Sequence, residues 1–218
     1  MALFRVRSAA VFGIHAHLID VEVDMYPGPR DFIMVGMPDT AVRESRQRIK
    51  SALINSGFGY PSKSVTINLA PANVRKEGAG FDLPMALGIL GAMGAVARSD
   101  KNMFIGELSL DGGLRPVRGA LSMAVCAGRT GIANLLVPAD NAAEASVASG
   151  VRVFGMRHLS EVVKFLNEPD GFQPASPSTP VDAAEDSSLP DFREVRGQSA
   201  ARRALEVAAA GAHNVLML

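Results

Sequence analysis

The side chains best suited to chemistry in this sequence are basic ones grouped on one predicted helix. Arg43, Arg46 and Lys50 are spaced three and four residues apart, so they share one side of a helix. Cations on one side of a helix can neutralise successive phosphates of a nucleic acid. Arg75 and Lys76 add two cations in a loop downstream. We therefore take these five residues as candidate nucleic-acid contacts.

The alternative interpretation of this basic group is a solvated helix face, or one that pairs with acidic residues of a neighbouring subunit. No aromatic residue interleaves these charges, and the chain has no Trp and two Tyr, which leaves little for base stacking. Lys and Arg number 22, as do Asp and Glu, so the formal net charge is zero. Nucleic-acid binding must then come from a local patch, and we do not expect sequence-specific readout.

The remaining reactive side chains indicate neither a metal site nor a cofactor. His15 and His17 share one face of a predicted strand, but no third ligand is evident, so we expect no metal there. Cys126 is the single cysteine, which excludes an intrachain disulfide and a multi-thiolate zinc site. The motif G-x-x-x-x-G-K-[ST] does not occur, so the sequence predicts no phosphate-binding loop for ATP.

The first part of the chain is predicted to form β-structure, and the basic helix follows it. Alternating apolar residues predict three strands between Phe4 and Met37. The basic residues follow on a helix that Asp39 can cap at its start and Gly57 can end. The segment KSVTINLAP predicts a further strand, and after a loop FDLPMALGILGAMGAVA predicts a buried helix capped by Asp82. The glycines of that helix weaken it unless a close neighbour uses the space.

The second half of the sequence alternates helices and strands. Asp111-Gly112-Gly113 between two apolar segments predicts a hairpin. The expected elements after it are a helix at 119–130, a strand at 134–137, a helix at 141–148, a strand at 151–154 and a helix at 159–167. Strands precede helices as often as they alternate with them, so the fold class is α+β, a mixed α/β arrangement.

Composition divides the chain into three parts. We assign residues 1–167 to the N-terminal domain and 168–190 to a linker, because that segment holds five of the 13 prolines with serines and acids. Residues 191–218 predict a helix over 199–210 and a strand from Asn214, as the truncated start of an α/β domain. No apolar run reaches the roughly 20 residues of a membrane helix, and the N-terminus lacks a signal-peptide core, so we expect a cytoplasmic protein.

Three long motifs carry a family resemblance. VGMPDTAVRESRQRIKSALINSGF, TINLAPANVRKEGAGFDLPMALGILGA and IGELSLDGGLRPVRGAL together resemble the ComM/YifB proteins, the magnesium-chelatase-like AAA+ ATPases involved in bacterial natural transformation. The resemblance implies a domain similar to the protease domain of Lon, a linker and an ATPase core. It also implies a hexameric motor that uses ATP and Mg²⁺ to remodel single-stranded or branched DNA.

The Lon resemblance can be tested at the two positions of its Ser/Lys dyad. The Lon pattern K-D-G-P-S-A-G aligns with residues 76–82 and places Gly80 at the nucleophile. The pattern around the base aligns with residues 106–121 and places Leu121 where the lysine is expected. Ser122 and Lys76 are the nearest hydroxyl and amine, and neither stands at a matching position. The resemblance therefore implies a Lon-like fold without Lon chemistry.

Our first interpretation is a non-catalytic N-terminal domain of an AAA+ DNA-remodelling ATPase, which serves assembly and DNA contact. Within this sequence we expect no enzymatic activity, whereas the full-length protein would be an ATPase. A regulatory domain of a magnesium-chelatase ATPase subunit is the alternative. A Lon-type serine peptidase is the third interpretation, and Gly80 argues against it.

Overall fold

The structure is a computed structural model of the 218-residue chain, and it describes residues 3–97, 100–177 and 192–217. Internal contacts divide the chain into two units, residues 1–178 and residues 179–218. Each unit is described by itself.

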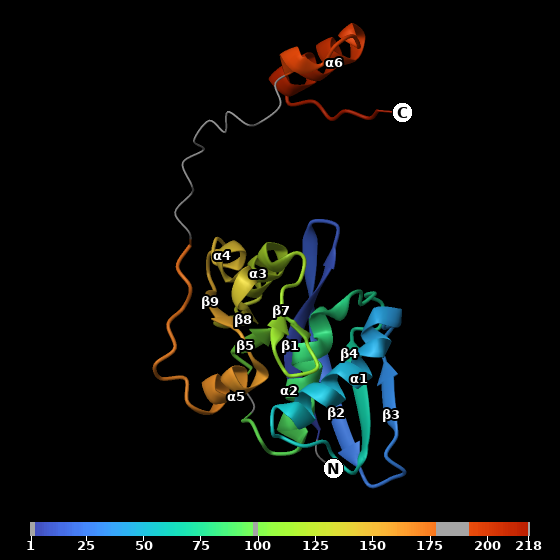
Figure 1. The fold of residues 1–218 in the computed structure, drawn as a ribbon, viewed down its shortest axis with the longest axis vertical. Coiled ribbons are helices and arrows are strands. Elements are labelled where there is room, and N and C mark those ends of the chain that lie inside the picture. The colour runs from blue at the N-terminus through green and yellow to red at the C-terminus, as the bar shows by residue number, and fades with distance from the viewer. Residues whose placement is uncertain (1–2, 98–99, 178–191, 218) are drawn as a thin grey trace. The chain divides into compact units, whose positions relative to one another are not determined.

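Unit 1 is built on one large mixed sheet (Figure 1). Its strands are β1 (Phe4–Phe12), β2 (His15–Tyr26), β3 (Phe32–Val35), β4 (Ser64–Ala70), β5 (Asn102–Phe104), β8 (Asn134–Pro138) and β9 (Arg152–Met156). The seven strands lie in the order β3-β4-β2-β1-β5-β8-β9. The pairs β1/β2 and β2/β4 are antiparallel, and the other neighbours are parallel. A separate short hairpin pairs β6 (Glu107–Leu108) with β7 (Leu114–Arg115).

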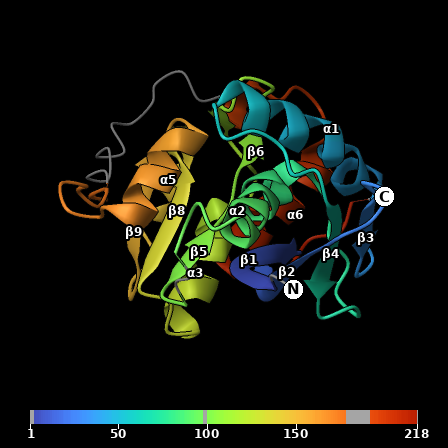
Figure 2. The same cartoon turned by 90° about the horizontal axis from the view of Figure 1, so that it is seen from below.

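Helices cover both faces of this sheet (Figure 2). One face packs against α1 (Thr40–Asn55), α2 (Asp82–Ala92) and α5 (Leu159–Asn167), and the other packs against α3 (Ala120–Arg129) and α4 (Ala142–Ala145). Each face has its own apolar core, which is the usual way for a sheet and helices to bury their apolar sides. The 3-10 helices are η1 (Ala79–Phe81), η2 (Ala139–Asn141) and η3 (Phe192–Glu194). The mixed α/β fold class predicted from the sequence is confirmed.

Two predictions about α2 have different outcomes. The expected close neighbours of its glycines are present: a Cβ on Gly88 would lie 2.4 Å from Val23 Cγ2, and one on Gly91 would lie 2.3 Å from the Phe4 ring. These glycines therefore let α2 approach β1 and β2 closely. The predicted cap was wrong, because the N-cap position is Phe81 and Asp82 is the first residue of the helix, fully buried.

The end of the chain also differs from prediction. Unit 2 contains η3 and the expected helix α6 (Ser199–Ala210), but residues 213–217 form no strand. A strand needs a neighbour that takes its backbone hydrogen bonds, and no described residue pairs with this segment.

The predicted linker at 168–190 lies partly outside the described residues. Within its described part, Ala175 N donates to Val153 O at 2.7 Å, so this segment lies along the edge of β9. Phe172 packs edge-on against Phe165, with ring centroids 5.3 Å apart. The domain bounds 1–167, 168–190 and 191–218 stay predictions. No described helix is both long enough and apolar enough to cross a bilayer.

Candidate functional site

Helix α1 carries most of the candidate residues, and its start is fixed by one carboxylate. Asp39 Oδ1 accepts from Val42 N at 2.8 Å, as an N-cap residue does. Asp39 Oδ2 accepts from Gly78 N at 3.2 Å, which ties the loop before η1 to the helix. The inner side of α1 is buried on the sheet through Val42, Ser45, Ile49, Ala52 and Leu53. The opposite side of α1 is therefore the side that is left to contact a partner.

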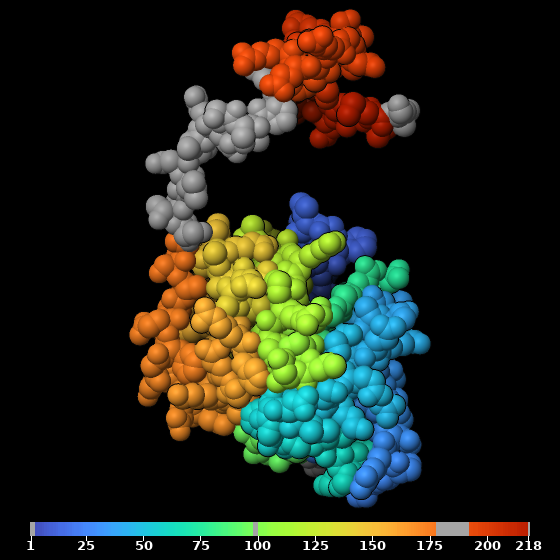
Figure 3. Space-filling model, viewed as in Figure 1, coloured from blue at the N-terminus to red at the C-terminus, as the bar shows by residue number. Residues whose placement is uncertain are grey.

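The outer side of α1 presents Arg43, Arg46 and Lys50, all exposed, which we call the basic face. Arg46 lies over the Phe32 ring at 5.5 Å, and Lys50 lies over the Tyr60 ring at 5.9 Å. No aromatic residue interleaves these cations in the sequence, but two rings from other elements pack against Arg46 and Lys50 in the structure. In the space-filling view, α1 and the segment of β3 lie side by side on the surface of unit 1 (Figure 3).

The two aromatic residues could not be found from sequence spacing because they belong to other elements. Phe32 begins β3 and Tyr60 follows α1, and both rings are partly buried. Burial raises the pKa of the Tyr60 hydroxyl, and the charge of Arg46 offsets part of that rise. The cation–π contacts hold the Arg46 and Lys50 side chains against these rings.

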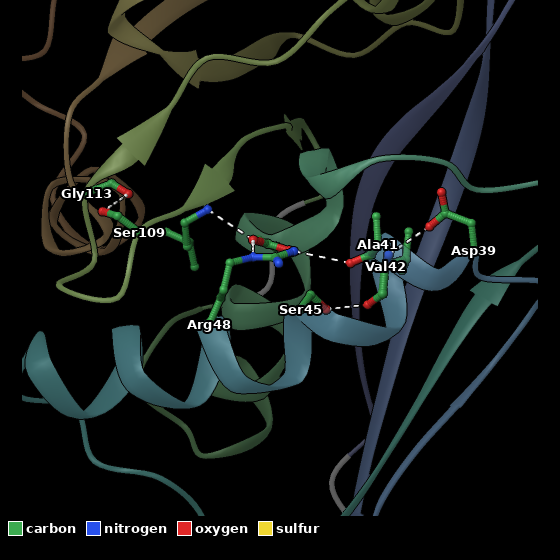
Figure 4. Close-up of polar contacts among 9 residues, drawn as sticks. Asp39, Ala41, Val42, Ser45, Arg48, Ser109 and Gly113 are labelled. Carbon is green, nitrogen blue, oxygen red and sulfur yellow. Dashed lines mark hydrogen bonds and ion pairs between the residues drawn. The ribbon is translucent and has the colours of Figure 1, made fainter.

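Arg48 lies on the same helix but extends inward. Its Nε donates to Asp82 Oδ2 at 2.7 Å and its Nη2 donates to Asp82 Oδ1 at 3.1 Å, a two-point contact. Leu108 N donates to the same carboxylate at 3.2 Å. Figure 4 shows the Arg48 side chain, whose Nη2 also donates to the Ala41 carbonyl at 3.3 Å. Helix α1, helix α2 and strand β6 are thus joined at one buried point.

The environment of Asp82 acts on its pKa in opposite directions. Burial raises the pKa, and the hydrogen bond and charge of Arg48 and the Leu108 amide lower it, so that the resulting pKa is about 6. The pKa of Arg48 is raised, chiefly by the hydrogen bond to Asp82. The desolvation cost of a carboxylate with no exposed side-chain surface exceeds the favourable contacts that it gains.

The loop cations Arg75 and Lys76 do not extend the basic face. Arg75 is exposed, but its Nε lies 2.9 Å from Glu77 Oε1. Lys76 is fully buried, and its ammonium donates to the carbonyl of Pro71. Burial also lowers the pKa of Lys76. A side chain without exposed surface cannot contact a phosphate, so Lys76 leaves the candidate set.

The two dyad positions line different hollows. Gly80, in η1, lines a cleft of about 590 Å³, whereas Leu121, in α3, lines another of about 430 Å³. The Cβ of a larger residue at Gly80 would meet only Val117 side-chain atoms, the nearest at 3.6 Å, so the nucleophile is missing although there is room for it. Ser122 Oγ donates to the Ile14 carbonyl and Lys76 donates to Pro71, so these two do not form a substitute dyad.

The remaining candidates form no reactive group. His15 and His17 are both exposed on β2, and no described cluster of three or more His, Cys, Asp and Glu side chains is placed to hold a metal ion. Cys126 is buried, and burial raises the pKa of its thiol. A thiol in that environment is a poor nucleophile.

Comparisons with known proteins show the family of this chain. Residues 21–141 match the family described as subunit ChlI of Mg-chelatase, and residues 191–218 match magnesium chelatase, subunit ChlI. The competence protein ComM of Haemophilus influenzae is 39% identical over all of this chain, and the YifB protein of Salmonella typhimurium is 40% identical. The chain belongs to the ComM/YifB family.

The same comparisons show how much of a ComM/YifB protein is present. The chain spans 43% of the length of both relatives. Lon protease 1 of Sorangium cellulosum is 30% identical over 67% of this chain, which corresponds to 20% of that protease. The similarity supports the Lon-like character of part of the fold, and the chain is part of an AAA+-type protein of the ComM/YifB family.

Proposed function

We propose that this chain is the N-terminal part of an ATP-driven, cytoplasmic DNA-remodelling protein, and that unit 1 is a non-catalytic domain that contacts DNA. The observation that carries the proposal is the 39% identity to a competence protein over all of this chain, which corresponds to 43% of that relative. The basic face supports it by supplying three exposed cations on one side of a rigid helix. Phosphate contacts of this kind give affinity without sequence preference.

The motor itself would lie outside this unit. Binding of ATP with Mg²⁺ needs a phosphate-binding loop, and this sequence has none, so unit 1 would act on DNA without touching the nucleotide. We further propose that the protein works as a hexameric ring. A ring repeats the basic face in every subunit, so individually weak phosphate contacts add up on one strand.

DNA titration of this chain at several salt concentrations tests the proposal. The probes are fluorescent single-stranded, duplex and forked DNA. The Arg43/Arg46/Lys50 triple alanine variant should bind single strands much more weakly, and loss of three phosphate contacts should reduce the salt slope by about 2. The control replaces the exposed Arg115, Arg129 and Arg152, which changes the net charge equally and should leave binding unchanged. No binding at low salt, or equal losses in both variants, contradicts the proposal.

A regulatory domain of a magnesium chelatase is the second candidate, favoured by the description of both matching families. Stimulation of the full-length ATPase separates the two candidates: single-stranded DNA should raise the rate under the first, and a porphyrin substrate under the second. Peptidase activity gains no support from the structure, since Gly80 and Leu121 occupy the dyad positions. Casein should therefore stay intact.

A further inference from the structure

Strand β1 has one edge that is only partly used. Along its whole length, from Phe4 to Phe12, it pairs with β2. On its other edge, Arg7 pairs with Met103 of β5, and among the described residues no strand continues this pairing along residues 9–12. Unpaired backbone groups on a strand edge are a template for another strand.

The edge is open because the chain after β5 turns away from β1. Ile105 N donates to Leu136 O at 3.1 Å, so this residue follows β8. Gly106 N then donates to Gly80 O at 3.0 Å, and Gly106 O accepts from Leu83 N at 3.0 Å. The two hydrogen bonds hold the chain against η1 and the start of α2, which leaves a gap next to β1.

That gap is the cleft of about 590 Å³. Its lining comes from the end of β1, from residues 77–81 and from residues 116–119. Small and glycine residues form much of the wall, so a backbone can approach closely. A volume of 300–1,000 Å³ is typical of sites that bind a ligand.

The charges around the cleft are predominantly acidic. Asp39, Glu77 and Glu107 line it, and Arg118 is the one cation in the lining. Arg75 pairs with Glu77 from outside the cleft. The side chain of Glu107 is partly exposed. Among the described residues, no basic side chain forms an ion pair with it of the kind seen for Arg48 with Asp82 or Arg75 with Glu77. An occupant that carries cations fits this surface better than one that carries carboxylates.

We propose that the cleft binds an extended peptide segment of a partner protein, rich in lysine or arginine, as an added strand on β1. Main-chain hydrogen bonds to the free edge supply the affinity, as in other cases of strand addition, and the acidic lining selects basic side chains. Residues 9–12 span about 13 Å, which is enough to pair with about four peptide residues. With glycine in place of the nucleophile, the peptide is held and released uncut.

Binding of labelled peptides to the full 218-residue chain tests this proposal. The probe is fluorescein-labelled Val-Lys-Val-Lys-Val-Lys, compared with the peptide that has Glu in place of Lys and with a lysine peptide N-methylated at alternate residues. We expect the lysine peptide to bind at least tenfold more tightly than either comparison peptide. Hydrogen exchange should slow at residues 9–12 when it is bound, and mass spectrometry should recover it intact.

Two variants check the location. Gly80→Leu places a branched side chain inside the cleft next to Val117 and should weaken binding at least tenfold. Glu107→Gln should weaken binding of the lysine peptide about threefold. Glu44→Gln, an exposed substitution on α1 outside the cleft, is the matched control and should leave binding unchanged. Equal binding of all three peptides, protection elsewhere than residues 9–12, or self-association in place of peptide binding would overturn the proposal. DNA binding by the Gly80→Leu variant should be normal, so failure here is distinct from failure of the proposed function.

Discussion

The two sides of helix α1 use the same residue type for different purposes. On the inner side, Arg48 forms a two-point contact with Asp82, whose side chain has no exposed surface. On the outer side, Arg46 lies in solvent over the Phe32 ring. The positions are two residues apart, which places them on different sides of the helix.

Burial of the partner decides what each arginine contributes to the folded state. A buried carboxylate that loses its cation is left with an uncompensated charge, which strongly destabilises the folded state. Removal of an exposed cation costs the folded state little stability, because water solvates the groups around it. The inner arginine should therefore matter for folding, and the outer cations should matter for binding.

The largest expected effect comes from removal of the inner arginine. Arg48→Met removes the hydrogen bonds and the charge that favour the ionised Asp82 carboxylate, so this buried group must stay charged without a partner or take up a proton. The free energy of unfolding at neutral pH should fall by about 3 kcal/mol. Urea denaturation followed by circular dichroism measures this change. Arg43→Met is the control on the outer side and should change the free energy of unfolding by less than about 0.5 kcal/mol. Equal effects of the two substitutions would contradict the comparison.

The pH dependence of stability tests the environment of Asp82. Its folded pKa of about 6 lies above the ordinary value of 3.8, so between these values the folded state binds more protons than the unfolded state. Stability from this group is therefore greatest below about pH 4 and is lost as pH rises through 6, by about 3 kcal/mol in total. Asp82→Asn lacks this titration, so the stability of the native chain relative to the variant should decrease from pH 4 to pH 7. A constant difference would show that the carboxylate is not desolvated.

A smaller loss of stability is expected from a change at the N-terminus of α1. Asp39→Ala removes the N-cap contact to Val42 and the contact to Gly78, so the free energy of unfolding should fall by about 1 kcal/mol. Thermal unfolding measures it, and Asp39→Asn should keep most of the stability because an amide oxygen also caps. A loss as large as that of Arg48→Met would mean that the cap, rather than the buried ion pair, fixes α1.

The smallest stability change is expected on the outer side. Lys50→Met removes the contact with the Tyr60 ring and should lower the free energy of unfolding by about 0.5 kcal/mol. The same variant should still weaken single-stranded DNA binding, which a fluorescence titration measures. Lys50→Arg keeps the charge and should restore the affinity.

Sequence patterns predicted much of this fold because its elements have strong local signals. The periodicity of residues 40–55 and the turn Asp111-Gly112-Gly113 each determine their structure locally. The role of Asp82 was missed because a carboxylate at a helix start looks like a cap, and nothing local reveals an arginine 34 residues earlier as its partner.

The candidate site was predictable in part for the same reason. The spacing of Arg43, Arg46 and Lys50 was sufficient to place them on one exposed side. The Phe32 and Tyr60 rings beside them depend on tertiary packing. The burial of Lys76 depends on its packing against the loop at Pro71, and the cleft depends on where the chain after β5 turns. Neither feature follows from a periodic pattern in the sequence, so neither could be predicted from it.

Paired measurements on Arg46→Met and Arg48→Met separate the binding role of the outer side of α1 from the folding role of its inner side. For each variant, the free energy of unfolding and the affinity for single-stranded DNA are measured at one pH and salt concentration, with affinity corrected for the folded fraction. Arg48→Met should lose about 3 kcal/mol of stability and keep its affinity, while Arg46→Met should keep its stability and lose affinity. If Arg46→Met binds DNA as the native chain does, the outer side of α1 is not a DNA contact and the proposed role of this domain is wrong.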